Sequence, residues 1–340
     1  MGFQYVQRRG NYVCLDQNPL LSLVRAHRLF MRYVGLGNAI RVALHRWAAR
    51  PLKKTLTLPV YGNACVRVQR GYMVFDLERS VATRVFRPRI APQLFRAQHA
   101  AFRKAGRLSF APTVRGVCDR EQWFEMDYVD GESGFVLLAP NADVFLDTLS
   151  EKVLPCLLEL SGSHEWRKMD LPKYSRQLAR RLEGTQLERW PNVQQRLRQF
   201  CERVRARLPA AGEVRLGYSH GDFVHPNLVL ASRGLRVIDW ECADWRSVTH
   251  DLYTFFFSQL FWRDGLAREA LADAEAVFIA ALGKRPVDLP TAVYRNLYYL
   301  ERLAMVMGRD FGPAEAEHID RSITLFEDFE ASDSLARASG

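Results

Sequence analysis

The sequence has no apolar run long enough to cross a bilayer and few features of a secreted or metal-cluster protein. No hydrophobic stretch in its 340 residues approaches the roughly 20 that a membrane-spanning helix needs. The N-terminus lacks the order of basic start, apolar middle and small-residue cleavage site that marks a signal peptide. The six cysteines show no paired metal-binding spacing and are too sparse for a disulfide scaffold. We therefore expect a cytoplasmic globular protein with reduced thiols.

Acidic residues are nearly absent from the first 58 positions. This segment holds ten Lys or Arg and one acid, Asp16, for a net charge of +9, whereas residues 59–340 hold 38 basic and 37 acidic residues. A nearly neutral body with one cationic segment indicates a localised anionic partner, whereas uniform basicity would suggest nucleic acid. Aromatic stacking platforms and a recognition helix are not evident, so we do not expect nucleic-acid binding.

Two helices are predicted in this basic segment, which we treat as an N-terminal helical extension at 1–58. The first begins with Asn18 as its cap and ends at Gly35; the second begins after Asn38 and ends before Pro51. Both mix bulky apolar residues with arginines, a pattern typical of helices that lie at an anionic membrane surface. The same pattern fits helices that pack on the body of the protein with their arginines in solvent. The sequence leaves both interpretations open.

From Leu56 onward the pattern changes to strands. Alternating runs joined by short turns indicate antiparallel strands, followed by a helix and a further strand. These elements are expected at 64–69, 72–78, 81–86, 92–105 and 121–131. Helical patterns then dominate. We therefore predict an α+β protein with a small antiparallel β lobe at 59–130 and a larger helical lobe at 131–340.

Polar residues gather in the stretch 218–240. Two β-rich runs separated by Ser-Arg-Gly at 232–234 predict a hairpin. The hairpin brings together Asn227, at the start of its first strand, and Asp239, at the end of its second, and Asp222 lies on the loop that leads in. One amide and two carboxylates are the oxygen set that Mg²⁺ and a hydroxyl nucleophile require. This pattern predicts a phosphoryl-transfer site.

The order of these residues is similar to that of a known family. His-Gly-Asp at 220–222, then Asn227, then a strand ending in Ile-Asp-Trp-Glu at 238–241, resembles the aminoglycoside phosphotransferase and choline kinase family, relatives of protein kinases. The resemblance runs from about Val60 to the C-terminal helices and implies a two-lobed protein-kinase-like fold. It implies that Asp222 is the catalytic base and that Asn227 and Asp239 hold the Mg²⁺ ions that bridge the phosphates of ATP.

The resemblance also implies supporting and nucleotide-binding residues. His220 would be a structural residue of the catalytic loop, and Asp251 would brace that loop. Met126 would line the adenine pocket, with the backbone carbonyl of Asp127 and the backbone N–H of Val129 meeting the adenine edge.

The sequence departs from the family pattern on the phosphate side. Gly71 is the single glycine of the expected phosphate-covering turn, Arg84 stands where the family has a phosphate-pairing lysine, and Gln98 stands where a helix glutamate would pair with it. No acid occurs between Arg87 and Phe110. Either Glu78 or another acid is the partner of Arg84, or Arg84 is a surface residue of an edge strand.

Two functions fit these observations. The first is an ATP- and Mg²⁺-dependent kinase that phosphorylates a hydroxyl of a small molecule or glycan. The second is a nucleotide-binding pseudokinase or scaffold that docks through its basic extension, an alternative favoured by Arg84 and Gln98 but opposed by the intact Asp222, Asn227 and Asp239.

The acceptor is expected to be anionic. Aminoglycosides are polycations and need carboxylates, whereas the helices over 173–208 are rich in arginine, with Arg176, Arg180, Arg181 and Arg189 among them. This argues against an aminoglycoside or choline-like amine. Together with the basic extension it suits peripheral contact with the anionic inner membrane surface and a glycolipid acceptor, such as a sugar of a lipopolysaccharide core.

Overall fold

The structure is a computed structural model. It describes residues 3–8, 11–14, 55–162, 166–183, 187–262, 270–282, 289–307 and 312–339. Contacts divide it into two compact units: unit 1 is Met1–Val136 with His225–Glu241, and unit 2 is Leu137–Val224 with Cys242–Gly340. Unit 1 holds an eight-stranded sheet and unit 2 holds most of the helices, which confirms the predicted α+β class.

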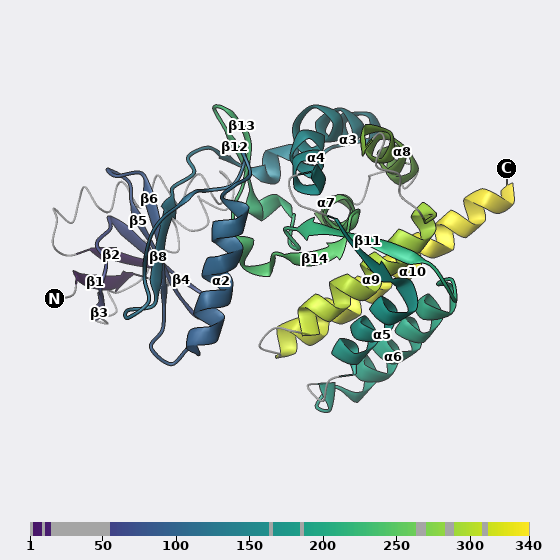
Figure 1. Ribbon diagram of the computed structural model, residues 1–340, viewed down its shortest axis with the longest axis horizontal. Coiled ribbons are helices and arrows are strands. Elements are labelled where there is room, and N and C mark those ends of the chain that lie inside the picture. The colour runs from purple at the N-terminus through teal and green to yellow at the C-terminus, as the bar shows by residue number, and fades with distance from the viewer. Residues whose placement is uncertain are drawn as a thin grey trace. The chain divides into compact units, whose positions relative to one another are not determined.

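The large sheet of unit 1 is antiparallel throughout (Figure 1). In sheet order its strands are β3 (Thr55–Leu58), β1 (Phe3–Arg8), β2 (Asn11–Cys14), β4 (Ala64–Val68), β5 (Gly71–Asp76), β6 (Val81–Phe86), β8 (Trp123–Asp127) and β7 (Val114–Cys118). The three strands predicted from alternation are the consecutive strands β4, β5 and β6.

The N-terminal segment differs from its prediction. Residues 3–8 and 11–14, assigned to a helical extension, form strands, and β2 pairs with β4 of the sheet. Tyr5, Val6 and Tyr12 are aromatic or β-branched, the residue types that favour strands. The predicted helices at 18–35 and 38–50 lie outside the described residues.

In the part of the chain that the structure describes, the helix that follows β6 packs against this sheet. Helix α2 (Pro92–Ala105) begins with proline in its first turn and is followed by Gly106, as the sequence predicts. Its Phe95 contacts Phe86 on β6 with ring centroids 5.4 Å apart, and its Phe102 contacts Phe124 on β8 at 5.1 Å. All four rings are buried. This aromatic layer fixes the face of α2 that points at the sheet.

A second, three-stranded sheet completes unit 1. It consists of β13 (Gly234–Val237), β12 (Leu228–Ala231) and the short β9 (Glu132–Ser133). The hairpin therefore belongs with the β unit and not, as the predicted boundaries had it, with the helical lobe. Backbone hydrogen bonds explain this, since Val237 N–H donates to the Phe110 carbonyl and the Arg236 guanidinium donates to the carbonyls of Ser109 and Ala111.

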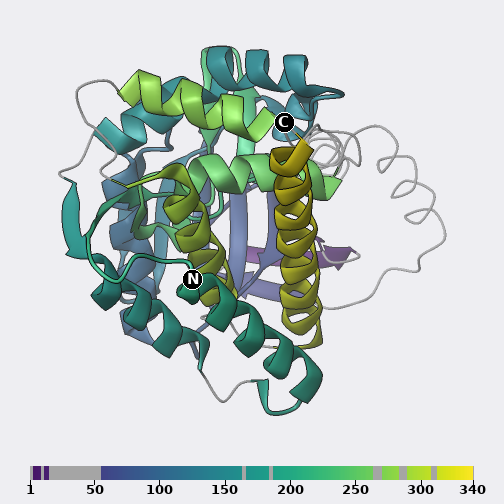
Figure 2. The same ribbon diagram turned by 90° about the vertical axis from the view of Figure 1, so that its right-hand side faces the viewer.

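Unit 2 is mainly helical. Its helices are α3 (Ala142–Thr148), continued through a π turn (Leu149–Val153) into α4 (Leu154–Gly162), α5 (Leu171–Leu182), α6 (Pro191–Ala206), α7 (His250–Trp262), α8 (Ala270–Leu282), α9 (Thr291–Met307) and α10 (Pro313–Ser339). Within this unit α3, α4 and α8 form one group and α5, α6, α9 and α10 another (Figure 1). Helices α9 and α10 run side by side (Figure 2).

Three strands of unit 2 were not predicted. β10 (Arg167–Asp170), β11 (Glu213–Ser219) and β14 (Asp244–Ser247) form an antiparallel sheet with β11 in the centre. Helix α7, directly after β14, is almost wholly buried; its Phe257 stacks on Tyr298 of α9 at 5.4 Å. Asp251 on α7 accepts a hydrogen bond from Ser219, the last residue of β11, and the His-Gly-Asp motif begins at the next residue.

Candidate functional site

The Asp222 loop, residues 219–222, leaves the end of β11 through a tight turn in unit 2. Gly221 has φ +83°, and a Cβ at this position would lie 2.5 Å from the carbonyl oxygen of Cys242. Only glycine combines this backbone conformation with so close an approach. The turn presents Asp222 immediately after it, and the fully buried Phe223, 6.3 Å from Phe255 of α7, anchors the chain on the other side.

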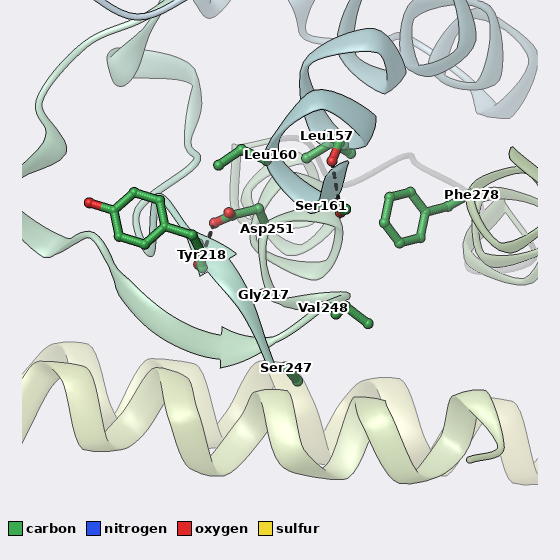
Figure 3. Close-up of a pocket in the computed structure, with 10 residues that line it drawn as sticks. Leu157, Leu160, Ser161, Gly217, Tyr218, Ser247, Val248, Asp251 and Phe278 are labelled. Atoms are coloured by element: carbon green, nitrogen blue, oxygen red, sulfur yellow. Dashed lines mark hydrogen bonds between the residues drawn. The ribbon is translucent and has the colours of Figure 1, made fainter. Parts of the chain in front are cut away.

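Asp251 holds the backbone of this loop. Its carboxylate accepts hydrogen bonds from Ser219 Oγ (3.0 Å), from the backbone N–H of His220 (2.8 Å) and from that of Gly221 (2.9 Å). Figure 3 shows Asp251 directed at the end of β11, beside a small cavity lined by Leu157, Leu160 and Phe278 among others. Charge-assisted bonds to two backbone amides are strong and directional. They support the bracing role predicted for Asp251.

His220 is entirely buried. Its Nδ1 accepts a hydrogen bond from the backbone N–H of Asp222 at 3.2 Å, and its ring meets that of Phe223 edge to face. These contacts fix the backbone of the loop from inside and support the structural role predicted for His220.

A second buried carboxylate, Glu301 on α9, was not singled out from the sequence. It accepts hydrogen bonds from Tyr174 Oη (2.5 Å), from Ser247 N–H (2.7 Å) and from Ser247 Oγ (2.8 Å). His250 links it to the loop, with Nδ1 2.8 Å from Glu301 Oε2 and Nε2 3.3 Å from the carbonyl oxygen of Gly221. Burial opposes ionisation of Glu301, but hydrogen bonds and the charge of His250 outweigh it and lower its pKa. Nothing in the local pattern of α9 marks this position.

Arg302, the next residue of α9, pairs with the candidate base. Its Nη1 lies 2.9 Å from Asp222 Oδ1, and the two side chains are 14% and 21% exposed. The same nitrogen lies 3.5 Å from the Gly221 carbonyl. An opposite charge at this distance favours the ionised carboxylate. No local pattern in the sequence indicates this pair, since 80 residues separate its members.

Asn227 and Asp239 meet at the open end of the hairpin in unit 1. The first bridge of the hairpin pairs Leu228 with Val237, and Ile238 N–H donates to the Asn227 carbonyl at 2.9 Å. Asp239 follows with φ +64°, a left-handed conformation that is uncommon for residues other than glycine and often found at functional sites. The structure thus brings these two residues together as predicted from the hairpin.

This pair has the chemistry of a magnesium site. An amide and a carboxylate offer hard oxygen ligands, and Mg²⁺ commonly takes one or two protein ligands and completes its shell with water and phosphate oxygens. No group of three or more His, Cys, Asp or Glu residues capable of holding a metal occurs in the part of the chain that the structure describes. Two protein oxygens are the number that Mg²⁺ commonly takes when phosphate oxygens complete its shell, so the donor set fits a metal shared with a bound nucleotide.

Arg84 lies on the inner strand β6 and is only 5% exposed, so it is not an edge-strand surface residue. Its Nη2 donates to the Gln69 carbonyl at 2.7 Å and to Glu241 Oε2 at 3.2 Å. Gln98 Nε2 donates to the same oxygen, also at 3.2 Å. Burial lowers the pKa of Arg84, against the opposing effects of Glu241 and Asp239. The acid that the sequence left unidentified is Glu241.

The other residues predicted to contact the nucleotide also lie in unit 1. Gly71 begins β5, where a Cβ would lie 2.0 Å from the Val85 carbonyl oxygen, so close strand packing requires a glycine. Met126, on β8, and Val129 are buried. The carboxylate of Asp127 accepts from Thr113 N–H and Arg115 Nε. Their predicted contacts with adenine stay predictions.

The arginines of α5 and α6 differ in their surroundings. Arg196 and Arg203 of α6 and Arg207, the residue that follows α6, form ion pairs with acids of α10. Arg176 and Arg180 of α5 are exposed and form no ion pair among the described residues. The α6 charges are thus used in packing, whereas the α5 charges face solvent.

Among the described residues no helix is long and apolar enough to cross a membrane.

Comparison with known proteins gives a family and several solved structures. The model of the phosphotransferase enzyme family matches residues 69–287, more than half of the chain. A choline kinase from Streptococcus pneumoniae is 15% identical, with a TM-score of 0.48 and coverage of 77% of this chain and 90% of that chain. A streptomycin- and ADP-bound aminoglycoside phosphotransferase from Streptomyces rimosus is 16% identical, with a TM-score of 0.40 and coverage of 69% and 90%. A glucosamine kinase is 16% identical, with a TM-score of 0.42 and coverage of 99% and 94%. A search of curated proteins found no match.

Proposed function

Because the chain belongs to the phosphotransferase enzyme family, we propose that it transfers the terminal phosphoryl group of ATP, with Mg²⁺, to a hydroxyl of a small molecule or glycan. The observation that carries this proposal is the Asp222 loop, in which Gly221 presents the carboxylate, Asp251 holds the backbone and Arg302 pairs with the side chain. Phosphoryl transfer needs positioning and charge stabilisation more than covalent chemistry from the protein. A rigidly held carboxylate meets that need.

In this proposal each residue has a defined task. Asp222 orients the acceptor hydroxyl and accepts its proton as the new oxygen–phosphorus bond forms; the bond from phosphorus to the bridging oxygen of ADP breaks, and ADP leaves. Asn227 and Asp239 would hold the Mg²⁺, which supplies neutralisation of phosphate charge. Arg84 is proposed to bind phosphate oxygens, which a guanidinium can grip through two parallel hydrogen bonds.

The proposed acceptor is anionic. A cation next to the base, Arg302, and the exposed arginines of α5 would attract phosphate or carboxylate groups and repel a polycation. A phosphorylated or acidic sugar of a glycolipid, such as a lipopolysaccharide core, has this chemistry. Contact of the basic segment 1–58 with an anionic membrane surface belongs to the same proposal. It rests on the net charge of this segment, +9, which comes from ten basic residues and one acid.

The test compares the full chain with Asp222→Asn, which keeps the shape of the side chain but cannot accept the proton. We expect the variant to lose at least a thousandfold in ATP turnover, measured with a panel of phosphorylated and neutral sugars. Calorimetry with Mg²⁺ and a non-hydrolysable ATP analogue should show unchanged nucleotide affinity. Turnover equal to the wild type would refute the role of Asp222. Nucleotide binding without turnover of any acceptor by the wild type would favour the pseudokinase alternative.

A further inference from the structure

Unit 1 contains a buried polar cluster that the family pattern does not account for. Arg84 on β6 and Gln98 on α2 are 5% and 4% exposed, and both donate to one carboxylate oxygen, Glu241 Oε2. Helix α2 contains no acid. The helix that faces Arg84 therefore offers a neutral amide, and the negative charge of the cluster comes from elsewhere in the chain.

The position of Glu241 is fixed by the core. It lies in a short 3-10 turn (Trp240–Cys242) directly after Asp239, and we call residues 239–241 the Asp239 segment. Trp240 is fully buried, donates from Nε1 to the Val237 carbonyl at 2.8 Å and lies 6.1 Å from the ring of Phe110. An anchored backbone limits where the Glu241 carboxylate can reach. Its side chain is 19% exposed, whereas that of Arg84 is 6% exposed.

A buried guanidinium needs a partner of this kind. Without a nearby anion, an arginine taken out of water is costly and its free hydrogen-bond donors adopt no single orientation. The Gln69 carbonyl supplies one fixed acceptor at 2.7 Å, and Glu241 supplies the charged one. Together they define the direction in which the Arg84 fork points.

We infer that Glu241 is the positioning residue of Arg84, and that it supplies from the Asp239 segment the negative charge that a helix glutamate would supply at position 98. The inference rests on the proposed function, in which Arg84 binds the phosphates of ATP. It has a further consequence: one short segment, 239–241, carries both a proposed metal ligand and the partner of the phosphate-binding cation. Metal binding and Arg84 orientation are then coupled through two peptide bonds and the buried ring of Trp240.

The inference can be tested by moving the charge. Glu241→Gln removes the negative charge of the cluster. The double variant Gln98→Glu with Glu241→Gln places that charge on α2. It keeps a hydrogen bond between an amide and a carboxylate, but the amide is now at 241 and the carboxylate at 98. Glu213→Gln is the matched control, because Glu213 pairs with Lys168 on the surface of unit 2 and both side chains are more than half exposed.

We expect Glu241→Gln to raise the dissociation constant of Mg²⁺ and a non-hydrolysable ATP analogue at least tenfold in calorimetry, and to raise KM for ATP more than it lowers kcat. The double variant should recover affinity to within about threefold of the wild type, and the control should not change. Thermal unfolding of each variant shows whether the fold persists.

Two outcomes contradict the inference. If the wild type binds nucleotide and the double variant binds no better than Glu241→Gln, Glu241 acts in some other way, for example as a direct metal ligand, and the inference is wrong. Wild-type affinity in Glu241→Gln would also overturn it. A wild type that binds no nucleotide overturns the proposed function first, and the inference with it.

Discussion

The Asp222 loop and the Arg84 cluster hold their charged groups in different ways. In unit 2, the Asp251 carboxylate accepts from two backbone amides and a hydroxyl, and Glu301 backs the same loop through His250. In unit 1, two side chains share one oxygen of Glu241, and burial lowers the pKa of Arg84. The loop is held mainly through its backbone amides, whereas in the cluster Glu241 holds the side chains of Arg84 and Gln98, with the Gln69 carbonyl as a second acceptor for Arg84.

The Asp222 loop provides a fixed geometry, whereas the Arg84 cluster provides a positive charge. A backbone held by buried carboxylates is in place before any ligand binds, as a base that must meet a hydroxyl at hydrogen-bond distance requires. A guanidinium held by the shared Glu241 oxygen and the Gln69 carbonyl can exchange the Glu241 contact for phosphate oxygens. Variants of the loop should therefore affect folding and turnover together, and variants of the cluster should mainly affect nucleotide affinity.

The largest effect is expected for Asp251→Ala. The change leaves three buried donors without their acceptor, each costing about 1–3 kcal/mol, so we expect a loss of about 4 kcal/mol in the free energy of unfolding and loss of turnover. Urea unfolding followed by circular dichroism measures this. The control is Asp143→Ala, an exposed residue in the first turn of α3, which should cost less than about 1 kcal/mol. Equal costs for the two variants would show that the loop is not fixed through Asp251.

The second effect concerns His225, which is buried in unit 1 directly before Pro226 and Asn227 and stacks with Phe135 at 6.4 Å. Burial lowers its pKa to about 4, from about 6.5 in the unfolded chain. Between these values the unfolded state binds a proton that the folded state does not. Stability from this residue is therefore present above pH 6.5 and is lost as the pH falls, by about 3 kcal/mol when complete near pH 4.

Urea unfolding at pH 7.5 and at pH 5 tests this expectation. Other groups also titrate in this range, so the quantity to compare is the pH-dependent change in the wild type minus that in His225→Asn. The variant should lose about 2 kcal/mol less than the wild type between these two pH values. Parallel changes in the two proteins would show that His225 does not carry the proton linkage and that this side of the hairpin is open to water.

The sequence predicted the residues of the candidate site better than their partners. Asn227 and Asp239 are joined by a short hairpin whose turn and alternation can be read locally, and α2 coincides with its predicted bounds, 92–105. By contrast, 157 residues separate Arg84 from Glu241. Such contacts depend on how elements pack, which periodicity does not specify. The lack of any acid in α2 was nevertheless a signal that the partner lies elsewhere.

The N-terminal strands show a different limit. Residues 3–8 and 11–14 contain strand-forming residues in runs of only six and four, and pairing among β1, β2 and β4 determines their conformation. Short strands gain their stability from partners, so a propensity too weak to read alone becomes decisive once an edge is available. The same reason explains why the four-residue strands β10 and β14 of unit 2 were not predicted. It does not apply to β11, which has seven residues and leads directly into the Asp222 loop.

The smallest expected effect distinguishes the arginines of α6 from those of α5. Arg196 on α6 donates to two acids of α10, Asp320 at 2.6 Å and Glu327 at 2.7 Å. Hydrogen bonding to Glu327 raises the pKa of Arg196. Arg180 on α5, by contrast, is exposed. We expect Arg196→Ala to lower the free energy of unfolding by about 1 kcal/mol and Arg180→Ala to change it by less than about 0.5 kcal/mol. The difference should shrink at 1 M salt because partly exposed ion pairs are screened. Denaturant unfolding at low and high salt provides the measurement. If Arg180→Ala costs as much as Arg196→Ala, the α5 arginines serve the fold, and the argument for an anionic acceptor then depends on Arg302 alone.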